Sequence, residues 1–173
     1  MTSLTEGRLQ FDFDGDDATK YDEWSFYRAQ FEKICNGNKA VDFIFVDGDE
    51  TWLIEVKDYR RHPTIKTIDL ADEIALKVRD TLAGIVAAKL NANEAAEKNL
   101  ARRALQKRRL RVVLHLEQPT NRSKLFPTAA DPAKLQQKLK QKIGAIDPHP
   151  LVVNRHRLHR TMNWTVTGIG ICP

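Results

Sequence analysis

The residues best suited to chemistry in this chain are two acids and a lysine that border two short apolar runs. Asp42 precedes the first run, and Glu55, Val56 and Lys57 end the second. The residues between the runs, 47–50, include an Asp-Gly pair, which is typical of a tight turn between antiparallel strands. The pattern predicts a β-hairpin that carries both carboxylates near its open end.

The turn determines which residues of the hairpin face each other. A two-residue loop places Asp47 opposite Glu50, and counting back along both strands places Asp42 opposite Glu55. A four-residue loop gives the same pairing. Facing residues on one side of a sheet have Cβ atoms about 4.5–5.5 Å apart. Lys57 follows Glu55 by two positions, so we expect it on the same face, about 7–8 Å from Asp42 on the diagonal.

Two like charges that face each other destabilise a sheet, so the pair Asp42 and Glu55 needs compensation. A shared proton would raise the pKa of one carboxyl group. A hard divalent cation is the other solution, because such ions prefer carboxylate oxygens. The alternative is a solvent-exposed face that merely carries three charges. Ile44, Val46 and Leu53 share that face, which favours burial.

Asp42, the run Glu55-Val56-Lys57 and the hairpin that carries them resemble the PD-(D/E)XK, or restriction-endonuclease-like, nuclease superfamily. The resemblance covers the hairpin and extends into the helices predicted on either side of it. It implies that Asp42 and Glu55 bind Mg²⁺ or Mn²⁺ together with the Val56 carbonyl, and that Lys57 orients or activates a water molecule. Val41 replaces the proline of the motif.

Members of this superfamily often add a glutamate from the preceding helix, and the resemblance directs attention to residues 20–35. An aromatic and aliphatic stripe that includes Tyr27 recurs there at helical spacing, which predicts a helix. Glu23 lies beside the stripe and is the candidate fourth catalytic residue, with Glu32 as the alternative. Asp22 is expected to be an acid of the first helical turn, favoured there by the helix dipole.

Basic residues form clusters within a modest net charge of +5. No acid interrupts the stretch 98–111, which holds seven lysines and arginines, and smaller basic groups occur at 134–142 and 155–160. Phosphate backbones attract such clusters, although each one could equally be a solvated face. Beside the nuclease-like motif they predict nucleic acid as the partner, DNA ahead of RNA, with candidate contacts from Lys77, Arg102, Arg103, Arg108 and Arg109.

The expected function is therefore a metal-dependent nuclease that hydrolyses phosphodiester bonds of DNA, less readily RNA, with Asp42, Glu55 and Lys57 as its catalytic core. The alternative is a catalytically inactive, nuclease-like subunit that binds nucleic acid or assembles a complex. The resemblance also implies a homodimer or a larger nuclease complex.

The composition indicates where the protein works. The chain holds no apolar run long enough to span a membrane, and its N-terminus lacks the features of a signal peptide. Cys35 and Cys172 are too few and too scattered for a disulfide framework, so both are expected to be reduced. We therefore expect a cytoplasmic protein without a membrane partner.

Helices that alternate with strands must position the hairpin. His115, on a predicted strand, is expected to be a core histidine. The pattern predicts one domain over residues 1–173, of mixed α/β (α+β) class: a three-layer α/β/α sandwich around a mixed central sheet, with a restriction-endonuclease-like core. The expected elements are a strand at 9–14, a helix at 20–35, the hairpin at 39–57, helices at 69–90 and 91–109, a strand at 110–116, a helix at 131–144 and a strand at 162–167.

Overall fold

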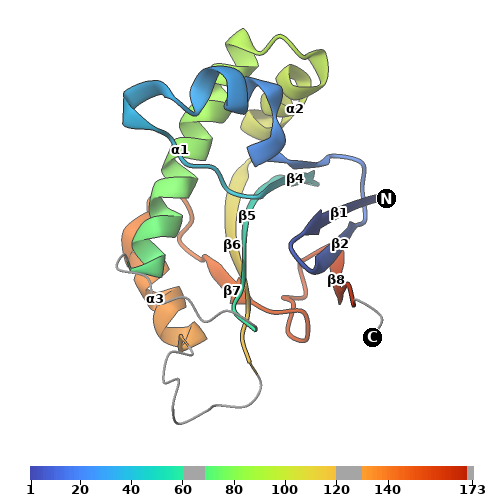
Figure 1. Cartoon of the computed structure of the whole chain (residues 1–173), viewed down its shortest axis with the longest axis vertical. Helices are drawn as coiled ribbons and strands as arrows, with labels where there is room; N and C mark the ends of the chain where they lie inside the picture. The colour runs from blue at the N-terminus through green and yellow to red at the C-terminus, as the bar shows by residue number, and fades with distance from the viewer. Residues whose placement is uncertain (61–68, 120–129, 171–173) are drawn as a thin grey trace.

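The computed structural model describes residues 1–60, 69–119 and 130–170 (Figure 1). Its elements, in chain order, are β1 (Thr2–Glu6), β2 (Leu9–Phe13), β3 (Ala18–Lys20), η1 (Tyr21–Glu23), η2 (Tyr27–Phe31), η3 (Ile34–Asn36), β4 (Phe43–Asp47), β5 (Glu50–Asp58), α1 (Leu70–Asn91), α2 (Ala95–Gln106), β6 (Arg109–Glu117), α3 (Pro132–Ile143), β7 (Leu151–Val153) and β8 (Trp164–Gly168).

A five-stranded mixed sheet in the order β3-β4-β5-β6-β7 forms the centre of the molecule. β3, β4 and β5 pair antiparallel, whereas β5 with β6 and β6 with β7 pair parallel. Parallel neighbours need crossover connections, and these contain α1 and α2 between β5 and β6, and α3 between β6 and β7. The mixed α/β (α+β) class and the mixed central sheet are thus confirmed.

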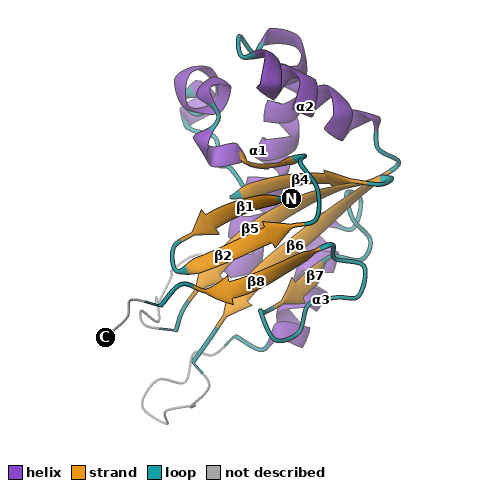
Figure 2. Ribbon diagram, turned by 90° about the vertical axis from the view of Figure 1, so that its right-hand side faces the viewer, coloured by secondary structure: helices purple, strands orange, loops and turns teal. Residues whose placement is uncertain are grey.

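The two faces of the central sheet are covered by different kinds of layer. The three α-helices lie on one face, and a second antiparallel sheet, β1-β2-β8, lies on the other (Figures 1 and 2). Leu53 belongs to the apolar cluster shared with Ile85 of α1. Phe43 belongs to the opposite cluster, together with Phe11 of β2 and Trp164 of β8.

The expected α/β/α layering is therefore corrected to helices, sheet and sheet. The strands around Phe11 and Trp164 alternate apolar and polar residues, so each offers one apolar face. Two such strands paired in register can bury that face only against another apolar surface, and the side of the central sheet turned away from the helices provides it. The sequence pattern predicted these strands but not that they form a separate sheet.

The hairpin register was predicted correctly. Phe43 pairs with Ile54 and Asp47 pairs with Glu50, as the two-residue loop requires. Gly48 in that loop has a φ of +50°, a left-handed conformation that glycine adopts without strain. Register follows from local turn geometry and from the two-residue period of a strand, which explains why the sequence alone was sufficient here.

The helix expected at 20–35 forms only as short, separate pieces. The segment contains η1 and η3, which are short 3₁₀ turns, and η2, a single stretch of π-helix. Cys35 and Asn36 have positive φ values of 52° and 66°, so the chain leaves helical geometry there. The Asn38 side chain donates to the carbonyls of Phe31 and Ile34 and stabilises this irregular end.

The other helices lie close to their predicted places, whereas three strands were missed. Asp69 caps α1 by accepting from the Ala71 amide, and Asp131 caps α3 through the Ala133 amide. α2 begins later than expected, after Glu94. β1, β3 and β7 were not predicted, because β3 and β7 have only three residues each and Leu4 is the only large apolar residue of β1.

None of the helices in the described part of the chain combines the length and the apolar character needed to cross a bilayer.

Cys35 is an exposed free thiol, and Cys172 lies outside the described residues. His115 is fully buried, as expected of a core histidine, and lies 3.1 Å from Glu117.

The irregular segment approaches α1 closely because position 84 is a glycine. A Cβ atom at Gly84 would lie 1.9 Å from the Tyr21 hydroxyl and 3.1 Å from a ring carbon of Phe31. Tyr21 is fully buried, and its hydroxyl has no hydrogen-bond partner among the described residues. Gly84 thus allows the segment before the hairpin to pack directly on the helix.

Replacing Gly84 should therefore destabilise the protein. We expect Gly84→Ala to lower the free energy of unfolding by about 1–3 kcal/mol, the usual cost of overpacking. Urea denaturation measures this. Tyr21→Phe alone should be close to neutral, and in that background Gly84→Ala should cost clearly less, because the nearest clashing atom is gone. An equal cost in both backgrounds would contradict the packing explanation.

Candidate carboxylate and lysine site

Asp42 and Glu55 meet at the open end of the hairpin, as predicted. Asp42 directly precedes β4, and its Oδ2 accepts a 2.6 Å hydrogen bond from the Val56 amide of β5. Glu55 is fully buried and Asp42 is 9% exposed. Both lie on the sheet face turned towards α1, where a charge is costly unless it is compensated.

Two lysines compensate Glu55. Lys57 of β5 and Lys77 of α1 each place the ammonium nitrogen 2.7 Å from the same atom, Oε1 of Glu55. Lys57 also lies 3.1 Å from Glu73, which belongs to α1. Glu73 was missed by the sequence analysis. Its spacing of four residues from Lys77 places both on one face of α1 and could have revealed it.

The electrostatics of the pair follow from its burial. Burial, and next the charge of Glu55, raise the pKa of Asp42 to about 7. Burial alone would lower the pKa of Lys57, but attraction to Glu55 and hydrogen bonds to Glu55 and Glu73 raise it overall. The second oxygen of Glu55, Oε2, is buried without a hydrogen-bond partner among the described residues. Within the described residues, the charge of Glu55 is therefore compensated through Oε1 alone.

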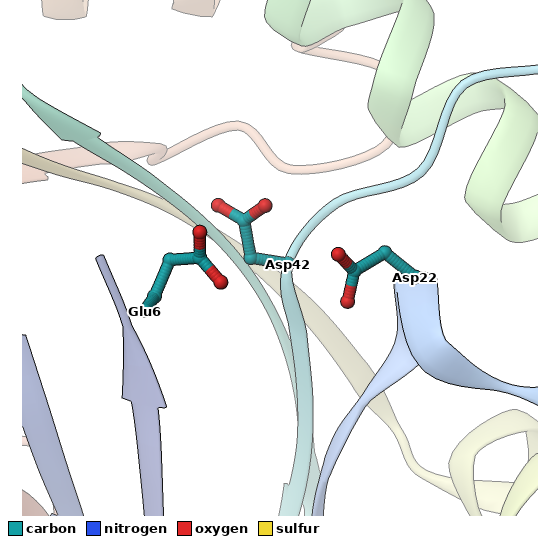
Figure 3. Close-up of side chains that lie close together, drawn as sticks. All are labelled: Glu6, Asp22 and Asp42. Atoms are coloured by element: carbon teal, nitrogen blue, oxygen red, sulfur yellow. The ribbon is translucent and has the colours of Figure 1, made fainter.

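Two further acids lie around Asp42. One carboxylate oxygen each from Glu6, Asp22 and Asp42 lie within 4.8 Å of one another, with Glu6 and Asp22 on either side of Asp42 (Figure 3). The Tyr21 amide donates to the Asp42 carbonyl over 2.9 Å, which places the neighbouring Asp22 beside the site. Lys20 lies 3.1 Å from Glu6 and neutralises part of the negative charge.

The prediction for the accessory glutamate needs correction. Glu23 turns to Lys20 at 3.0 Å, its side chain is half exposed, and it is not part of the acidic cluster. A regular helix would have been needed to aim Glu23 at the hairpin, and that helix does not form. Asp22 lies in the turn η1, as expected of a first-turn acid, and it also belongs to the acidic cluster, which was not predicted. Glu6 carried no detectable signal, because it reaches the site from a strand that was not predicted.

A groove of about 630 Å³ opens beside Asp42. Asp22, Arg28, Lys39 and Lys77 also line it, and so does Glu32, the alternative to Glu23. Lys77 therefore belongs both to the groove and to the ion pair with Glu55. Such a surface can hold a hard cation on carboxylate oxygens and a phosphate on the neighbouring basic groups.

The remaining predicted nucleic-acid contacts lie elsewhere. Arg102 and Arg103 are exposed on α2, and Arg108 and Arg109 follow at the start of β6. Arg103 lies 2.6 Å from Asp17, and Arg109 lies 3.2 Å from Glu50. Of the five predicted contacts, only Lys77 has a described contact with Asp42 or Glu55, namely its ion pair with Glu55.

Comparisons with known proteins connect the chain to a different class of enzyme. No family model matches the sequence, and no solved structure matches it. The sequence is similar to the cysteine--tRNA ligase of Neisseria meningitidis serogroup A: 40% identical over 167 residues, which spans 78% of this chain and 24% of the ligase. The chain thus spans about a quarter of the length of the curated relative that it matches.

This similarity overturns the assignment to the PD-(D/E)XK superfamily and the expected function as a DNA nuclease or other hydrolase. The resemblance depended on a few residues of one hairpin, whereas the match to the ligase covers most of the chain. Opposed acids with a lysine nearby are a local solution to charge burial, so they do not by themselves specify a reaction. The relative's name describes an enzyme, which is compatible with an enzymatic setting but not with a magnesium-dependent nuclease.

The raised pKa of Asp42 predicts a pH-dependent stability. The unfolded carboxyl group ionises near 3.8 and the folded one near 7, so unfolding releases a proton between these values and stability falls as the pH rises through this window. Asp42→Asn carries no charge and can still accept from the Val56 amide. In EDTA we expect it to gain about 2–4 kcal/mol relative to wild type between pH 4 and pH 8, measured by urea denaturation. A difference that does not vary with pH would contradict this assignment.

Proposed function

We propose that the chain is an RNA-binding part of a tRNA-ligase-related protein, directed at tRNA, with a Mg²⁺ ion held beside Asp42 and Glu55. The observation that carries this proposal is the 40% identity to a cysteine--tRNA ligase across 78% of the chain. A ligase of that name acts on tRNA. Because the match spans a quarter of the ligase, we assign RNA binding to this chain and not the complete ligation reaction.

The exposed side of α2 is the proposed RNA surface. The opposite side of the helix is buried through Leu100, Ala101 and Ala104, so Arg102 points away from the core. Guanidinium groups bind phosphate oxygens through strong, charge-assisted hydrogen bonds. Within the described parts of the chain, Arg102 bonds to a side-chain amide, and neither it nor Arg108 has a carboxylate partner. Both are therefore available to RNA, whereas the ion-paired Arg103 and Arg109 would have to exchange partners.

Removing Arg102 and Arg108 should weaken binding to tRNA. We expect Arg102→Ala/Arg108→Ala to reduce the affinity for tRNA roughly tenfold. The slope of log affinity against log salt concentration should become shallower by about two, since each arginine neutralises about one phosphate. Fluorescence anisotropy with labelled tRNA measures the affinity and its salt dependence. The range of about 50 to 200 mM salt is suitable because phosphate contacts weaken steeply over it.

The matched control is Lys134→Ala/Lys140→Ala, which removes the same charge from the exposed side of α3. Equal losses for the two double variants would show a non-specific charge effect and contradict the α2 surface. A DNA duplex that binds wild type as tightly as tRNA would contradict the assignment to tRNA.

The chemistry of the donors supports Mg²⁺ at the hairpin. Mg²⁺ prefers oxygen ligands and is commonly held by one or two carboxylates. The unpartnered Oε2 of Glu55 and the raised pKa of Asp42 both mark negative charge that a cation would stabilise. The Val56 carbonyl stays a proposed third ligand; the Val56 amide already bonds to Asp42. When bound, the ion would offer a positive centre to phosphate.

Adding Mg²⁺ or Mn²⁺ should raise the melting temperature of wild type by several degrees, because a ligand that binds only the folded state stabilises it. Glu55→Gln should abolish this shift. Glu23→Gln, which changes an acid outside the site in the same way, should retain it. Thermal denaturation with and without EDTA measures these shifts.

An unchanged wild-type melting temperature would overturn the proposed ion site. In a separate experiment, tRNA incubated with wild type and Mg²⁺ should be recovered at full length. Fragments that form only with the metal and disappear in Asp42→Ala would contradict a role limited to binding.

We also propose a cytoplasmic location, which the exposed free thiol of Cys35 supports, since reduced thiols are typical of the cytosol. A homodimer or a larger complex stays a prediction.

A further inference from the structure

We propose that the groove beside Asp42 binds one phosphate-bearing nucleotide unit of an RNA strand together with a divalent cation. This inference rests on the proposed function and adds a second, cation-dependent RNA contact to the α2 surface. Its ligand chemistry is a phosphate and a divalent cation taken up as a pair.

The charges of the groove favour such a pair. Three acids, Asp22, Glu32 and Asp42, and three bases line it together: Arg28, Lys39 and Lys77. An anion alone would meet the acids, and a cation alone would meet the bases. A metal ion bound by the carboxylates and a phosphate bound by the basic groups would together compensate the acids and the bases, because the two ligands also neutralise each other.

The groups are arranged by depth. Asp42 and the side chain of Lys77 lie inside, 9% and 16% exposed respectively. Arg28 and Lys39 are exposed at the rim. A cation therefore fits at the inner end, beside Asp42, and the phosphate fits between it and the two rim residues.

The rim residues are held in place without using the groups that would bind phosphate. Nε of Arg28 donates to the Asp22 carbonyl over 2.9 Å, and the Lys39 amide donates to Asp80 over 3.0 Å. In the described part of the chain, the terminal Nη atoms of Arg28 and the ammonium of Lys39 have no ion-pair partner. The fold thus directs the Arg28 side chain and anchors the Lys39 backbone, and the terminal groups of both remain free for a ligand.

The dimensions match a single nucleotide. A volume of about 630 Å³ lies within the range of small-molecule sites and is too small for a duplex. The aromatic wall, Tyr27, is only 7% exposed, and its hydroxyl already donates to the Asn38 carbonyl. Little ring surface is left for base stacking, so the groove should recognise phosphate and charge with little selectivity among bases.

The test uses Arg28→Ala/Lys39→Ala in the full chain, with Lys134→Ala/Lys140→Ala as the charge-matched control. In Mg²⁺ we expect the rim variant to bind tRNA about tenfold more weakly than wild type, the loss expected from two phosphate contacts. In EDTA the difference should shrink to about twofold, because without the cation the phosphate meets the uncompensated acids. The control should match wild type in both buffers.

Competition identifies the source of the phosphate. A short single-stranded RNA should displace labelled tRNA at a much lower concentration than a nucleoside monophosphate does. A monophosphate that competes equally well would overturn the RNA strand as the ligand. Arg28→Lys/Lys39→Arg should restore Mg²⁺-dependent binding, which excludes a folding defect as the cause of the loss.

The outcomes separate this inference from the function on which it rests. If wild type does not bind tRNA in either buffer, the proposed function fails. If wild type binds tRNA through Arg102 and Arg108 but the rim variant keeps its Mg²⁺-strengthened affinity, only the groove inference fails. An equal loss in Mg²⁺ and EDTA would also overturn it, because the cation would then play no part.

Discussion

The site depends on one buried charge, that of Glu55, and on the two ammonium groups that hold it between the sheet and α1. A fully buried carboxylate costs several kcal/mol unless it is paired with good geometry. Lys57 and Lys77 meet this requirement at 2.7 Å each, one from the same strand and one from the helix. The ion pairs therefore join α1 to β5, and they leave Asp42 as the acid whose charge lacks a comparable ammonium contact. Burial, and next the charge of Glu55, therefore raise the pKa of Asp42.

The features that could be predicted from the sequence are those determined by neighbours in the chain. The register of Asp42 and Glu55 followed from a two-residue turn and the period of a strand. The start of α1 followed from a capping aspartate. The cluster of Glu6, Asp22 and Asp42 follows from none of these, because it needs β1 beside β3 and η1 hydrogen-bonded to Asp42. Likewise, no local signal shows that aromatic residues will pack on a glycine of α1 and displace a regular helix.

The same distinction between local and global information explains why the family resemblance misled. An acid pair with a nearby lysine describes how a hairpin can manage charge, and several classes of protein need that arrangement for phosphate or for metal ions. Family membership concerns the whole chain. The layers here are helices, sheet and sheet, and the sequence similarity that spans most of the chain connects it to a tRNA ligase. The hairpin was located correctly, and the reaction assigned to it was not.

A basic protein that gathers acids at its groove poses an electrostatic problem for RNA binding. On the proposed function, Arg102 of α2 would attract phosphate over long distances, but a phosphate entering the groove would meet repulsion from Asp22, Glu32 and Asp42, which grows as water is excluded. A divalent cation bound beside Asp42 would reverse the sign of the local charge in the groove. General attraction by α2 should therefore need no metal, whereas entry into the groove should require it. On the proposed function, the acids would exclude phosphate from the groove unless the ion is bound, which gives a reason for retaining Asp42 in a buried position where its charge is costly.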